Sequence, residues 1–430
     1  MDETRARLPM TAMVKDAGMA AGVAALLAIP LLGFRLEDSV RGLSLGYRWT
    51  WIVYAAAAVF SGRLLLGVAA RAAVPALRRW IAAKGVTRRL PGDLNVKVGW
   101  GLGIFAALIP VLFFWDLRVI DVVTVILLYT MLGWGLNIVV GLAGLLDLGY
   151  VAFYAIGAYT YALLSVNFGF SFWVCLPLAA MASLTLGVLL GFPVLRLRGD
   201  YLAIVTLGFG EIIRVILLNW AEVTGGPNGI MQIPGPTLFG LDFKYNAAPG
   251  TGFAEFLGLP YDRAYGMIFL YYVIFLLALA TTLFAQRMRR LPTGRAWEAL
   301  REDEIACRSL GINPVTVKLS AFAIGASFAG LAGVFFATRQ GLVTPESFTF
   351  IESATILAIV VLGGMGSQMG IVLAAVLLVG LPEWARDLRE YRMLAFGAAM
   401  VLIMLWRPQG LLSHRSPTVT LGPGKAQAAA

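Results

Sequence analysis

Two charged residues, Glu211 and Arg214, lie inside an otherwise apolar stretch of this chain. Residues three apart share one side of a helix, so the carboxylate and the guanidinium are placed to neutralise each other. Two functions are open for the pair. It could hold a helix in place as a buried ion pair, or Glu211 could contribute to a polar path across a membrane, as intramembrane acids do in transporters.

Other residues that could carry chemistry are sparse. The chain has two cysteines, Cys175 and Cys307, and one histidine, His414, which are too few for a metal cluster. No Gly-x-x-x-x-Gly-Lys-Ser/Thr phosphate loop occurs. No clustered acids are present that would serve a membrane-embedded transferase. The sequence therefore predicts no catalytic residues, no metal and no cofactor, and a protein that is not an enzyme.

Composition indicates which elements must position these residues. Hydrophobic residues make up 59% of the chain and charged residues 13%, whereas soluble domains carry about 25% charged residues. A membrane-spanning helix needs roughly 20 apolar residues. We predict an all-α, polytopic membrane helical bundle with about 10–12 transmembrane segments. The apolar stretches are Met19–Phe34, Trp49–Ala70, Val98–Trp115, Val122–Leu146, Gly149–Val166, Phe172–Leu195, Tyr201–Trp220, Tyr265–Phe284, Leu319–Ala337, Ser353–Met365, Met369–Leu381 and Leu394–Trp406.

The shortest of these stretches, Ser353–Met365 and Met369–Leu381, are open to two interpretations, one broken helix or a re-entrant pair. Small residues four apart, such as Gly187 and Gly191, are typical of close helix packing. A break in composition near residue 95 suggests three parts. We expect an accessory module of two spans and a basic connector (1–97), a core (98–412) and a flexible cytoplasmic tail (413–430).

Charge predicts the orientation of the spans. The basic segments Arg71–Lys97 and Ala285–Lys318 should be cytoplasmic, together with both termini, and the loop Ala221–Ala264 should lie outside. The formal net charge of +10 therefore follows from topology. Binding to nucleic acid is not needed to explain it.

The segment Gln286–Lys318 is charged and helix-forming although it lies between two apolar runs. We predict a helix with its N-cap at Thr293 and its end at Gly311. A polar helix cannot lie in hydrocarbon, so this one should sit at the membrane face, where a partner protein can bind it. Trp297 and Leu300 are the expected anchors for that partner. The alternative is an ordinary solvated loop helix.

Several strings of the sequence together resemble one family. They are Gly144–Tyr159 (GLLDLGYVAFYAIGAY), Thr206–Arg214 (TLGFGEIIR), Thr224–Ile230 (TGGPNGI), Gly294–Asn313 (GRAWEALREDEIACRSLGIN), Gly363–Ser367 (GGMGS) and Arg407–Leu411 (RPQGL). The ordered strings are similar to the permeases of branched-chain amino-acid ABC importers, specifically the LivM type. The two-span N-terminal extension also resembles LivM and distinguishes it from its shorter sister LivH.

The resemblance implies partners and a location. It implies a multi-pass protein of the bacterial inner membrane that works with a LivH-type sister permease, two ATP-binding subunits and a periplasmic amino-acid-binding protein. The solutes would be L-leucine, L-isoleucine and L-valine, moved by alternating access with ATP hydrolysed by the partners. An ion-coupled secondary amino-acid transporter is the alternative, and it would need its own ion site.

The resemblance and the residue patterns also give candidate site residues. Expected ATPase-coupling residues are Gly294, Arg295, Ala296, Trp297, Glu298, Leu300, Arg301, Glu304, Arg308 and Gly311. The spacing from Glu304 to Gly311 is one residue longer than the general pattern of ABC importers. Residues expected along the solute pathway, as an apolar wall or as polar contacts, are Asn137, Tyr150, Phe153, Tyr154, Tyr159, Thr206 and Glu211.

Overall fold

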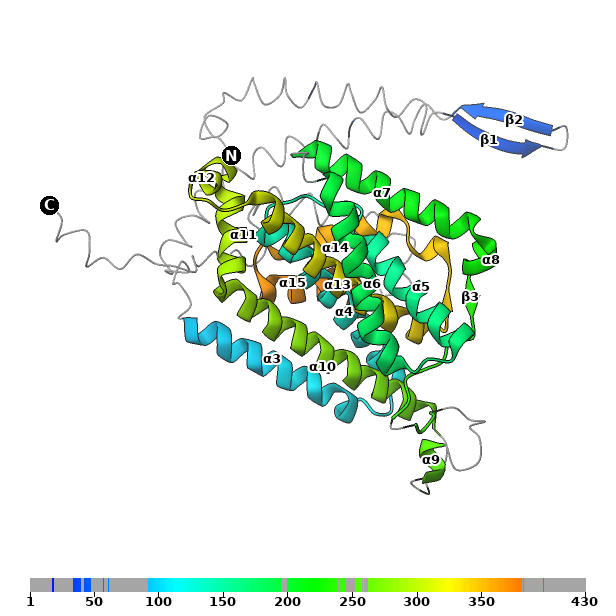
Figure 1. Cartoon of the computed structure of the whole chain (residues 1–430). Helices are drawn as coiled ribbons and strands as arrows, with labels where there is room; N and C mark the ends of the chain where they lie inside the picture. Colours follow the sequence, from blue (N-terminus) through cyan, green and yellow to red (C-terminus); the bar gives the residue numbers. More distant parts are fainter. Residues whose placement is uncertain are drawn as a thin grey trace. The chain divides into compact units, whose positions relative to one another are not determined.

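The computed structural model describes residues 92–380, with gaps at 195–198, 239, 244–251, 257 and 259–261 (Figure 1). It also describes two strands near the N-terminus and a few isolated positions. The chain divides into two compact units, residues 1–96 and 97–430.

Several predicted segments lie outside the described residues, apart from single positions or their ends. They are the spans Met19–Phe34, Trp49–Ala70 and Leu394–Trp406, most of the connector Arg71–Lys97, and the tail 413–430.

The first unit contains a hairpin that the sequence analysis did not predict. Strand β1 (Phe34–Ser39) pairs antiparallel with β2 (Gly42–Tyr47), with Phe34 opposite Tyr47 and Ser39 opposite Gly42. The hairpin occupies the segment between the first two predicted spans. It is therefore an exception to the all-α prediction, in a connection that is too polar to form a span.

The larger unit is helical. Its helices in chain order are α3 (Gly92–Leu112), α4 (Leu117–Leu136), α5 (Val151–Phe168), α6 (Phe172–Val194), α7 (Asp200–Asn219), α8 (Ala221–Thr224), α9 (Phe253–Phe256), α10 (Arg263–Arg290), α11 (Pro292–Glu302), α12 (Glu304–Ser309), α13 (Pro314–Gln340), α14 (Phe350–Gly363) and α15 (Gln368–Ala375). Two π-helical turns, η2 (Asn137–Leu142) and η5 (Val376–Gly380), continue α4 and α15. The short elements η3 (Gly226–Asn228), η4 (Pro345–Ser347), β3 (Ile230–Met231) and β4 (Leu342–Val343) lie in connections.

Seven helical stretches among the described residues are long and apolar enough to cross a membrane. They are 117–142, 151–168, 172–192, 201–219, 264–290, 314–340 and 345–363. Shorter apolar helices cover 101–112 and 368–380. The predicted helical membrane bundle is therefore confirmed for this part of the chain.

Helix α13 lies at the centre of the bundle, because small residues let neighbouring backbones approach it. A Cβ atom added at Gly157 of α5 would collide with the backbone of Gly330 in α13, and one added at Gly187 of α6 would lie 2.7 Å from Ala326 Cβ. Without a hydrophobic force between helices in lipid, such close approach stabilises the bundle through dispersion. The packing role that was predicted for Gly187 is confirmed.

Helix α3 is held to α10 at a place set by a proline. Pro110 lies inside α3 and has no N–H group, so the carbonyl of Ala106 loses its helical donor. The hydroxyl of Tyr271 in α10 donates a hydrogen bond of 2.5 Å to that carbonyl. Tyr272 donates to the next carbonyl, that of Ala107, at 3.2 Å. The backbone group that proline leaves unpaired thereby becomes a contact between helices.

Helices α14 and α15 form an antiparallel hairpin against α4. Along α14, Glu352 accepts a bond from Tyr129 of α4, and Ile359 approaches Gly133. Along α15 and its continuation η5, the contacts run along α4 in the opposite direction. The carbonyl of Gln368, at the start of α15, accepts from Trp134, whereas Gly380, at the end of η5, approaches Ile126. The two short predicted stretches are therefore two antiparallel helices joined at residues 364–367 and not one broken helix; that they form a re-entrant pair stays a prediction.

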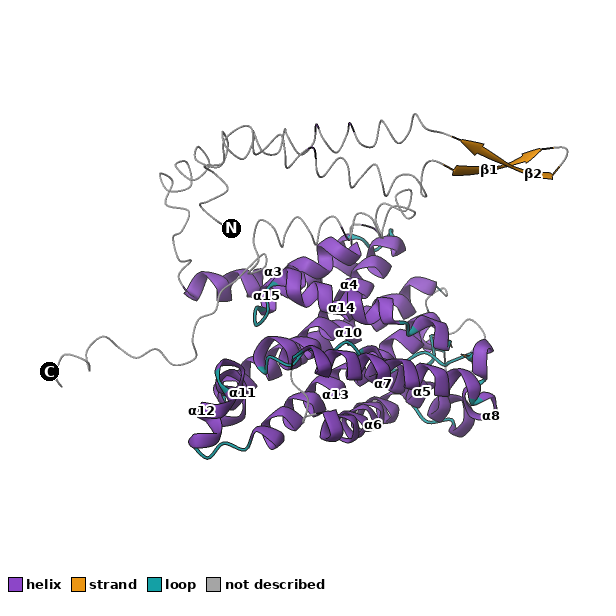
Figure 2. Cartoon of the chain, turned by 90° about the horizontal axis from the view of Figure 1, so that it is seen from above, coloured by secondary structure: helices purple, strands orange, loops and turns teal. Residues whose placement is uncertain are grey.

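Different short elements lie at the two ends of the bundle. Helices α11 and α12 lie at one end, and α8 lies at the other (Figure 2). At the α8 end, β3 pairs with β4, and the hydroxyl of Tyr161 donates to the carbonyl of Pro234 at 2.6 Å. The basic segment and the loop that were predicted on opposite sides of the membrane are thus at opposite ends of the molecule.

Candidate functional site

The charged segment after α10 folds as two helices and not as the single helix that was predicted. Helix α11 begins at Pro292 with Leu291 as its N-cap, so the predicted N-cap at Thr293 is wrong. Proline suits this first helical position because its missing N–H would be unpaired there in any case. Asp303 then interrupts the helix and caps α12, with its Oδ1 accepting from the backbone N–H groups of Ile305 and Ala306 at 2.7 and 3.0 Å.

The end of this segment was predicted correctly. Helix α12 ends at Ser309, and Gly311 adopts a φ of +81°, a left-handed conformation that favours glycine. The backbone N–H of Ile312 returns to the carbonyl of Cys307 at 3.0 Å. At the other end, Gly294 is required because a Cβ atom would strike the carbonyl of Met288 in α10.

Trp297 and Leu300 are not available as anchors for a partner. Both side chains are buried, Trp297 completely. The indole N–H of Trp297 donates to the carbonyl of Val317 at 3.1 Å and to the hydroxyl of Ser320 at 2.9 Å, both in α13. Trp297 therefore holds α11 against α13, and the burial of both side chains contradicts the expectation that they insert into an ATPase. The sequence alone could not reveal that α13 covers them.

Helix α12 carries the exposed apolar side chains instead. Ile305 is 70% exposed and Leu310 is 80% exposed. In the single continuous helix that was predicted, Ile305 would lie on the same side as Trp297, whereas in the structure the helix is interrupted at Asp303 and Ile305 is at the surface. Leu310 was missed by the sequence analysis, although its place between Ser309 and Gly311 in a polar turn was a usable signal.

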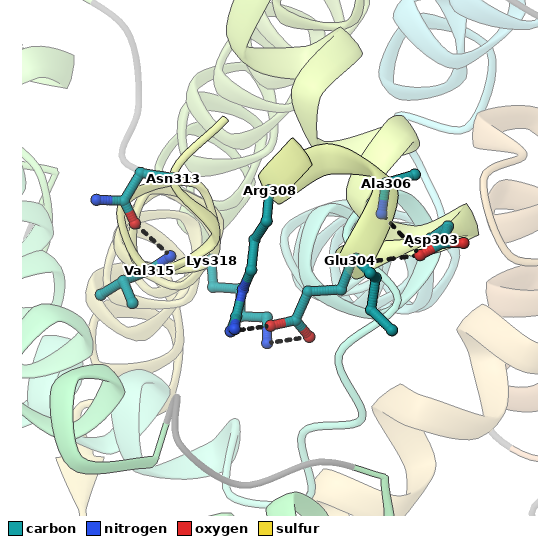
Figure 3. A network of polar contacts seen from close by, with 8 residues as sticks. Asp303, Glu304, Ala306, Arg308, Asn313, Val315 and Lys318 are labelled. Atoms are coloured by element: carbon teal, nitrogen blue, oxygen red, sulfur yellow. Dashed lines mark hydrogen bonds and ion pairs between the residues drawn. The ribbon is translucent and has the colours of Figure 1, made fainter. Parts of the chain in front are cut away.

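A charge network fixes α12 to the bundle (Figure 3). The carboxylate of Glu304 forms an ion pair with Lys318 of α13 at 3.1 Å. It forms a second with Arg308, which like Glu304 belongs to α12, at 2.9 Å. Lys318 is buried, whereas Arg308 is exposed. Asn313 caps α13 by accepting from the N–H of Val315 at 3.0 Å. The network gives α12 a defined orientation, although much of its surface is free of contacts with this chain.

Arginines connect α10 and α11 to the ends of other helices. Arg301 donates to the carbonyl of Gly141 in η2 and packs beside Gly144, where a Cβ atom would lie 2.6 Å from its Cγ. Arg289 pairs with Glu298 at 3.0 Å and donates to the carbonyl of Gly366, between α14 and α15, at 3.4 Å. Arg295 and Ala296, the remaining predicted coupling residues, lie on the more accessible side of α11.

The connection between η2 and α5 contains a buried acid that the sequence analysis missed. Asp147 accepts from the N–H of Gly149 at 2.9 Å through Oδ1, while its Oδ2 has no partner among the described atoms. Burial raises the pKa of Asp147 from 3.8 to about 6, an effect that the hydrogen bond from the backbone N–H of Gly149 partly offsets. The sequence did carry a signal for this site, because Asp147 is a single acid between two apolar stretches.

The polar pathway candidates Asn137 and Thr206 hold helix breaks in place. Asn137 accepts from the N–H of Gly366 at 2.7 Å. The hydroxyl of Thr206 accepts from the N–H of Leu148 at 3.0 Å and donates to the carbonyl of Ala203 at 3.0 Å. Both side chains are buried. Their hydrogen bonds are thus used within the chain.

The aromatic pathway candidates are packed in the core. Tyr150, Phe153, Tyr154 and Tyr159 are all buried. Tyr150 donates to the carbonyl of Gly325 at 3.0 Å, and Tyr154 makes an edge contact with the ring of Phe348. In this conformation α13 and the segment before α14 cover these side chains, and their role along the solute pathway stays a prediction.

Glu211 is the one pathway candidate with a substantially exposed side chain. It accepts a bond of 2.8 Å from Arg214 Nε, which confirms the predicted pairing. The side chains are 41% and 28% exposed, so the pair is not buried within this chain as one interpretation required. The structure therefore separates the candidates into a packed interior set and this ion pair on the outer surface of α7.

Comparisons with known proteins extend the geometric description. Residues 118–404 match the family described as branched-chain amino acid transport system / permease component, and residues 12–115 match a domain of unknown function. The high-affinity branched-chain amino acid transport system permease protein LivM of Salmonella typhimurium is 54% identical over 386 residues, covering 88% of this chain and 89% of that protein. LivM of Escherichia coli strain K12 is 53% identical over 387 residues, with the same coverage.

A more distant similarity links the chain to another import system. The autoinducer 2 import system permease protein LsrC of Escherichia coli strain SMS-3-5 is 28% identical over 263 residues, covering 55% of this chain and 64% of that protein. No solved structure matches the chain. Since the family match covers most of the chain and the LivM similarity nearly all of it, this multi-pass membrane protein belongs to the family of permease components of branched-chain amino acid transport systems.

Proposed function

We propose that this permease imports L-leucine, L-isoleucine and L-valine by alternating access. The observation that carries the proposal is the 54% identity, over 88% of the chain, with a protein whose name states high-affinity branched-chain amino acid transport. The helices supply a membrane-spanning scaffold, and each conformational state is populated according to its differential binding of partners and solute.

Energy comes from other subunits in this proposal. The chain contains no phosphate loop, and a permease component of an ABC system works with ATP-binding subunits. We propose two of these, together with a LivH-type sister permease and a periplasmic amino-acid-binding protein. The predicted division into residues 1–97, 98–412 and 413–430 stays part of the proposal, with the middle part as the transport core.

We propose that α12 is the surface that docks the ATP-binding subunit. Ile305 and Leu310 project from a short helix whose N-terminus is capped by Asp303 and whose orientation is set by Glu304 and Lys318. Exposed apolar side chains on a preorganised element are suited to be interface anchors, since little conformational entropy is lost on binding. They take the role that was first assigned to Trp297 and Leu300.

The link from α11 to the bundle supports the same function. Arg301 reaches η2, and Arg289 reaches the turn between α14 and α15. A displacement of α11 and α12 by an ATP-binding subunit would therefore act directly on the ends of two other spans. The coupling segment is proposed as a unit, with Arg295 and Arg308 at its rim, where exposed charges contribute little to affinity.

The test is uptake of leucine into proteoliposomes that contain the complete complex, with ATP on the side of α12. We expect the double variant Ile305→Ser/Leu310→Ser to assemble in the membrane, to bind the ATP-binding subunits roughly tenfold or more weakly, and to lose uptake in proportion. Phe256→Ser is the matched control, because it removes an exposed apolar side chain at the opposite end of the bundle.

Two results would contradict the proposal. Unchanged ATPase association and uptake in the double variant would remove α12 from the interface. Concentrative uptake by the permease alone, driven by an ion gradient without ATP, would identify a secondary transporter instead.

A further inference from the structure

The ion pair of Glu211 and Arg214 lies at mid-depth of its span. Helix α7 begins at Asp200, and the candidate span covers residues 201–219. At about 1.5 Å per residue, Glu211 is about 16 Å from the start of the helix, which is halfway through a hydrocarbon layer about 30 Å thick. The pair is therefore far from both polar ends of the bundle.

The face of α7 that carries the pair has no partner among the described residues. Ile204, Gly208 and Val215 share this face with Glu211 at helical spacing, and all three are exposed. A Cβ atom added at Gly208 would meet nothing within 4 Å. By contrast, Leu202 and Thr206 on the other side are buried against the bundle. The exposed face thus combines apolar side chains with a glycine notch and two opposite charges.

Such a face is unfavourable towards lipid. Ionisable side chains within spans almost always face the interior of a bundle or a water-filled cavity, because hydrocarbon offers them no hydrogen bonds. The mutual bond of 2.8 Å satisfies only part of the hydrogen-bonding capacity of a guanidinium and a carboxylate. The remaining donors and acceptors require a polar counterpart, which the membrane does not supply.

The solute of the proposed function has the complementary chemistry. A branched-chain amino acid is a zwitterion, with an ammonium that suits a carboxylate and a carboxylate that suits a guanidinium. The pair and the solute are each neutral overall, so exchange between them leaves no net charge in the span. The adjacent Ile212 and Val215 are exposed and offer apolar contact for the side chain of the solute.

We propose that the outward face of α7 is a solute subsite in the membrane, where Glu211 meets the α-ammonium and Arg214 meets the α-carboxylate of the passing amino acid. The inference deepens the proposed function and rests on it. The pair closes on itself when the subsite is empty and opens towards the zwitterion when the subsite is filled. Alternating access then exposes the same pair first to one side of the membrane and then to the other.

The first experiment separates recognition from a structural role. A purely structural pair can be replaced by two neutral residues with little loss, because both charges are removed together. Under the proposal, the double variant Glu211→Gln/Arg214→Gln assembles and keeps its thermal stability but loses at least tenfold in maximal leucine uptake. Its ATP hydrolysis stimulated by the binding protein persists, so fewer amino acids are moved per ATP.

The matched control is a second partly exposed ion pair, Asp121 with Arg339, which also has a bond of 2.8 Å. It lies between the outer ends of α4 and α13 and has no role in the proposed subsite. We expect Asp121→Asn/Arg339→Gln to keep uptake within about twofold of the unchanged complex. Normal uptake by the Glu211→Gln/Arg214→Gln complex would overturn the proposal and leave that pair a structural feature.

The second experiment measures occupancy without transport. In a complex in which Cys175 and Cys307 of this chain are replaced by serine, Gly208→Cys places a thiol one turn from Glu211. We expect a hydrophilic thiol reagent to modify it, and saturating leucine with the binding protein to slow the modification at least threefold. Leu108→Cys, on a face of α3 that exposes Ile104 and Val111, should not react because it faces lipid.

The two proposals fail in different ways. Absence of ATP-driven leucine uptake by the complex without substitutions would contradict the proposed function. If that complex transports leucine but Gly208→Cys is inert, or reacts at the same rate with and without leucine, only the subsite is excluded.

Discussion

Asp147 shows how a single side chain can make stability depend on pH. Its pKa of about 6 in the folded chain is above the ordinary value of 3.8, because burial disfavours the charged form. The folded state therefore binds the proton more tightly than the unfolded state. The stabilisation of the folded state by this proton on Asp147 is fully present below about pH 3.8 and is lost as the pH rises through 6.

We expect Asp147→Asn to reduce this pH dependence. The free energy of unfolding of the variant should exceed that of the unchanged protein by an amount that grows between pH 5 and 8 and reaches about 2–3 kcal/mol. One unit of pKa shift corresponds to about 1.4 kcal/mol. Thermal unfolding in detergent across this range measures it. Asp116→Asn, at the exposed N-cap of α4, controls for the removal of one negative charge. An equal gain at pH 5 and pH 8 would show that Asp147 does not titrate in this range.

At the scale of elements, Trp297 is the residue that bonds α11 to α13. Trp297→Ala should destabilise the protein by about 3–5 kcal/mol, because it leaves a cavity in place of a fully buried indole and removes its bonds to α13. The sequence analysis expected Trp297 to be an anchor for a partner protein, and its complete burial assigns it to the folding of this chain instead.

Thermal unfolding and the yield of folded protein test the prediction. Arg295→Ala is the control on the exposed side of the same helix and should change stability by less than about 0.5 kcal/mol. A stable Trp297→Ala protein that loses only ATPase binding would restore the anchor role.

The sequence predicted those elements whose signals are local. Span positions follow from runs of apolar residues, and the bond between Glu211 and Arg214 follows from their spacing within one helix. The burial of Trp297 depends on Val317 and Ser320, and the site of Asp147 involves Thr206. Such contacts between distant residues have no local signal, so the burial of Trp297 and the buried acid Asp147 were not predicted.

At the scale of the whole molecule, the orientation in the membrane can be tested at the two ends of the bundle. We expect Ser309→Cys in α12 to react only with reagent on the cytoplasmic side and Gly235→Cys to react only from outside, because basic segments are retained inside. Both positions are exposed, and a Cβ atom at Gly235 meets nothing within 4 Å. Labelling of sealed cells and inverted vesicles measures this. The reverse pattern would invert the topology.

The glycine contacts around α13 have a mechanical consequence. Where Gly157 and Gly187 let backbones of α5 and α6 reach α13, there is no side chain that could repack to allow sliding. The spans of α7 and α10 are 28% and 22% buried within the chain, against 61% and 67% for α5 and α13; α6 is also only 28% buried, so its glycine contacts with α13 are what attach it to the centre. We therefore expect α5, α6 and α13 to move as one rigid body during transport, while α7 and α10 shift against it, so that the moving surfaces are at the margins of the bundle and its centre serves as the fixed frame.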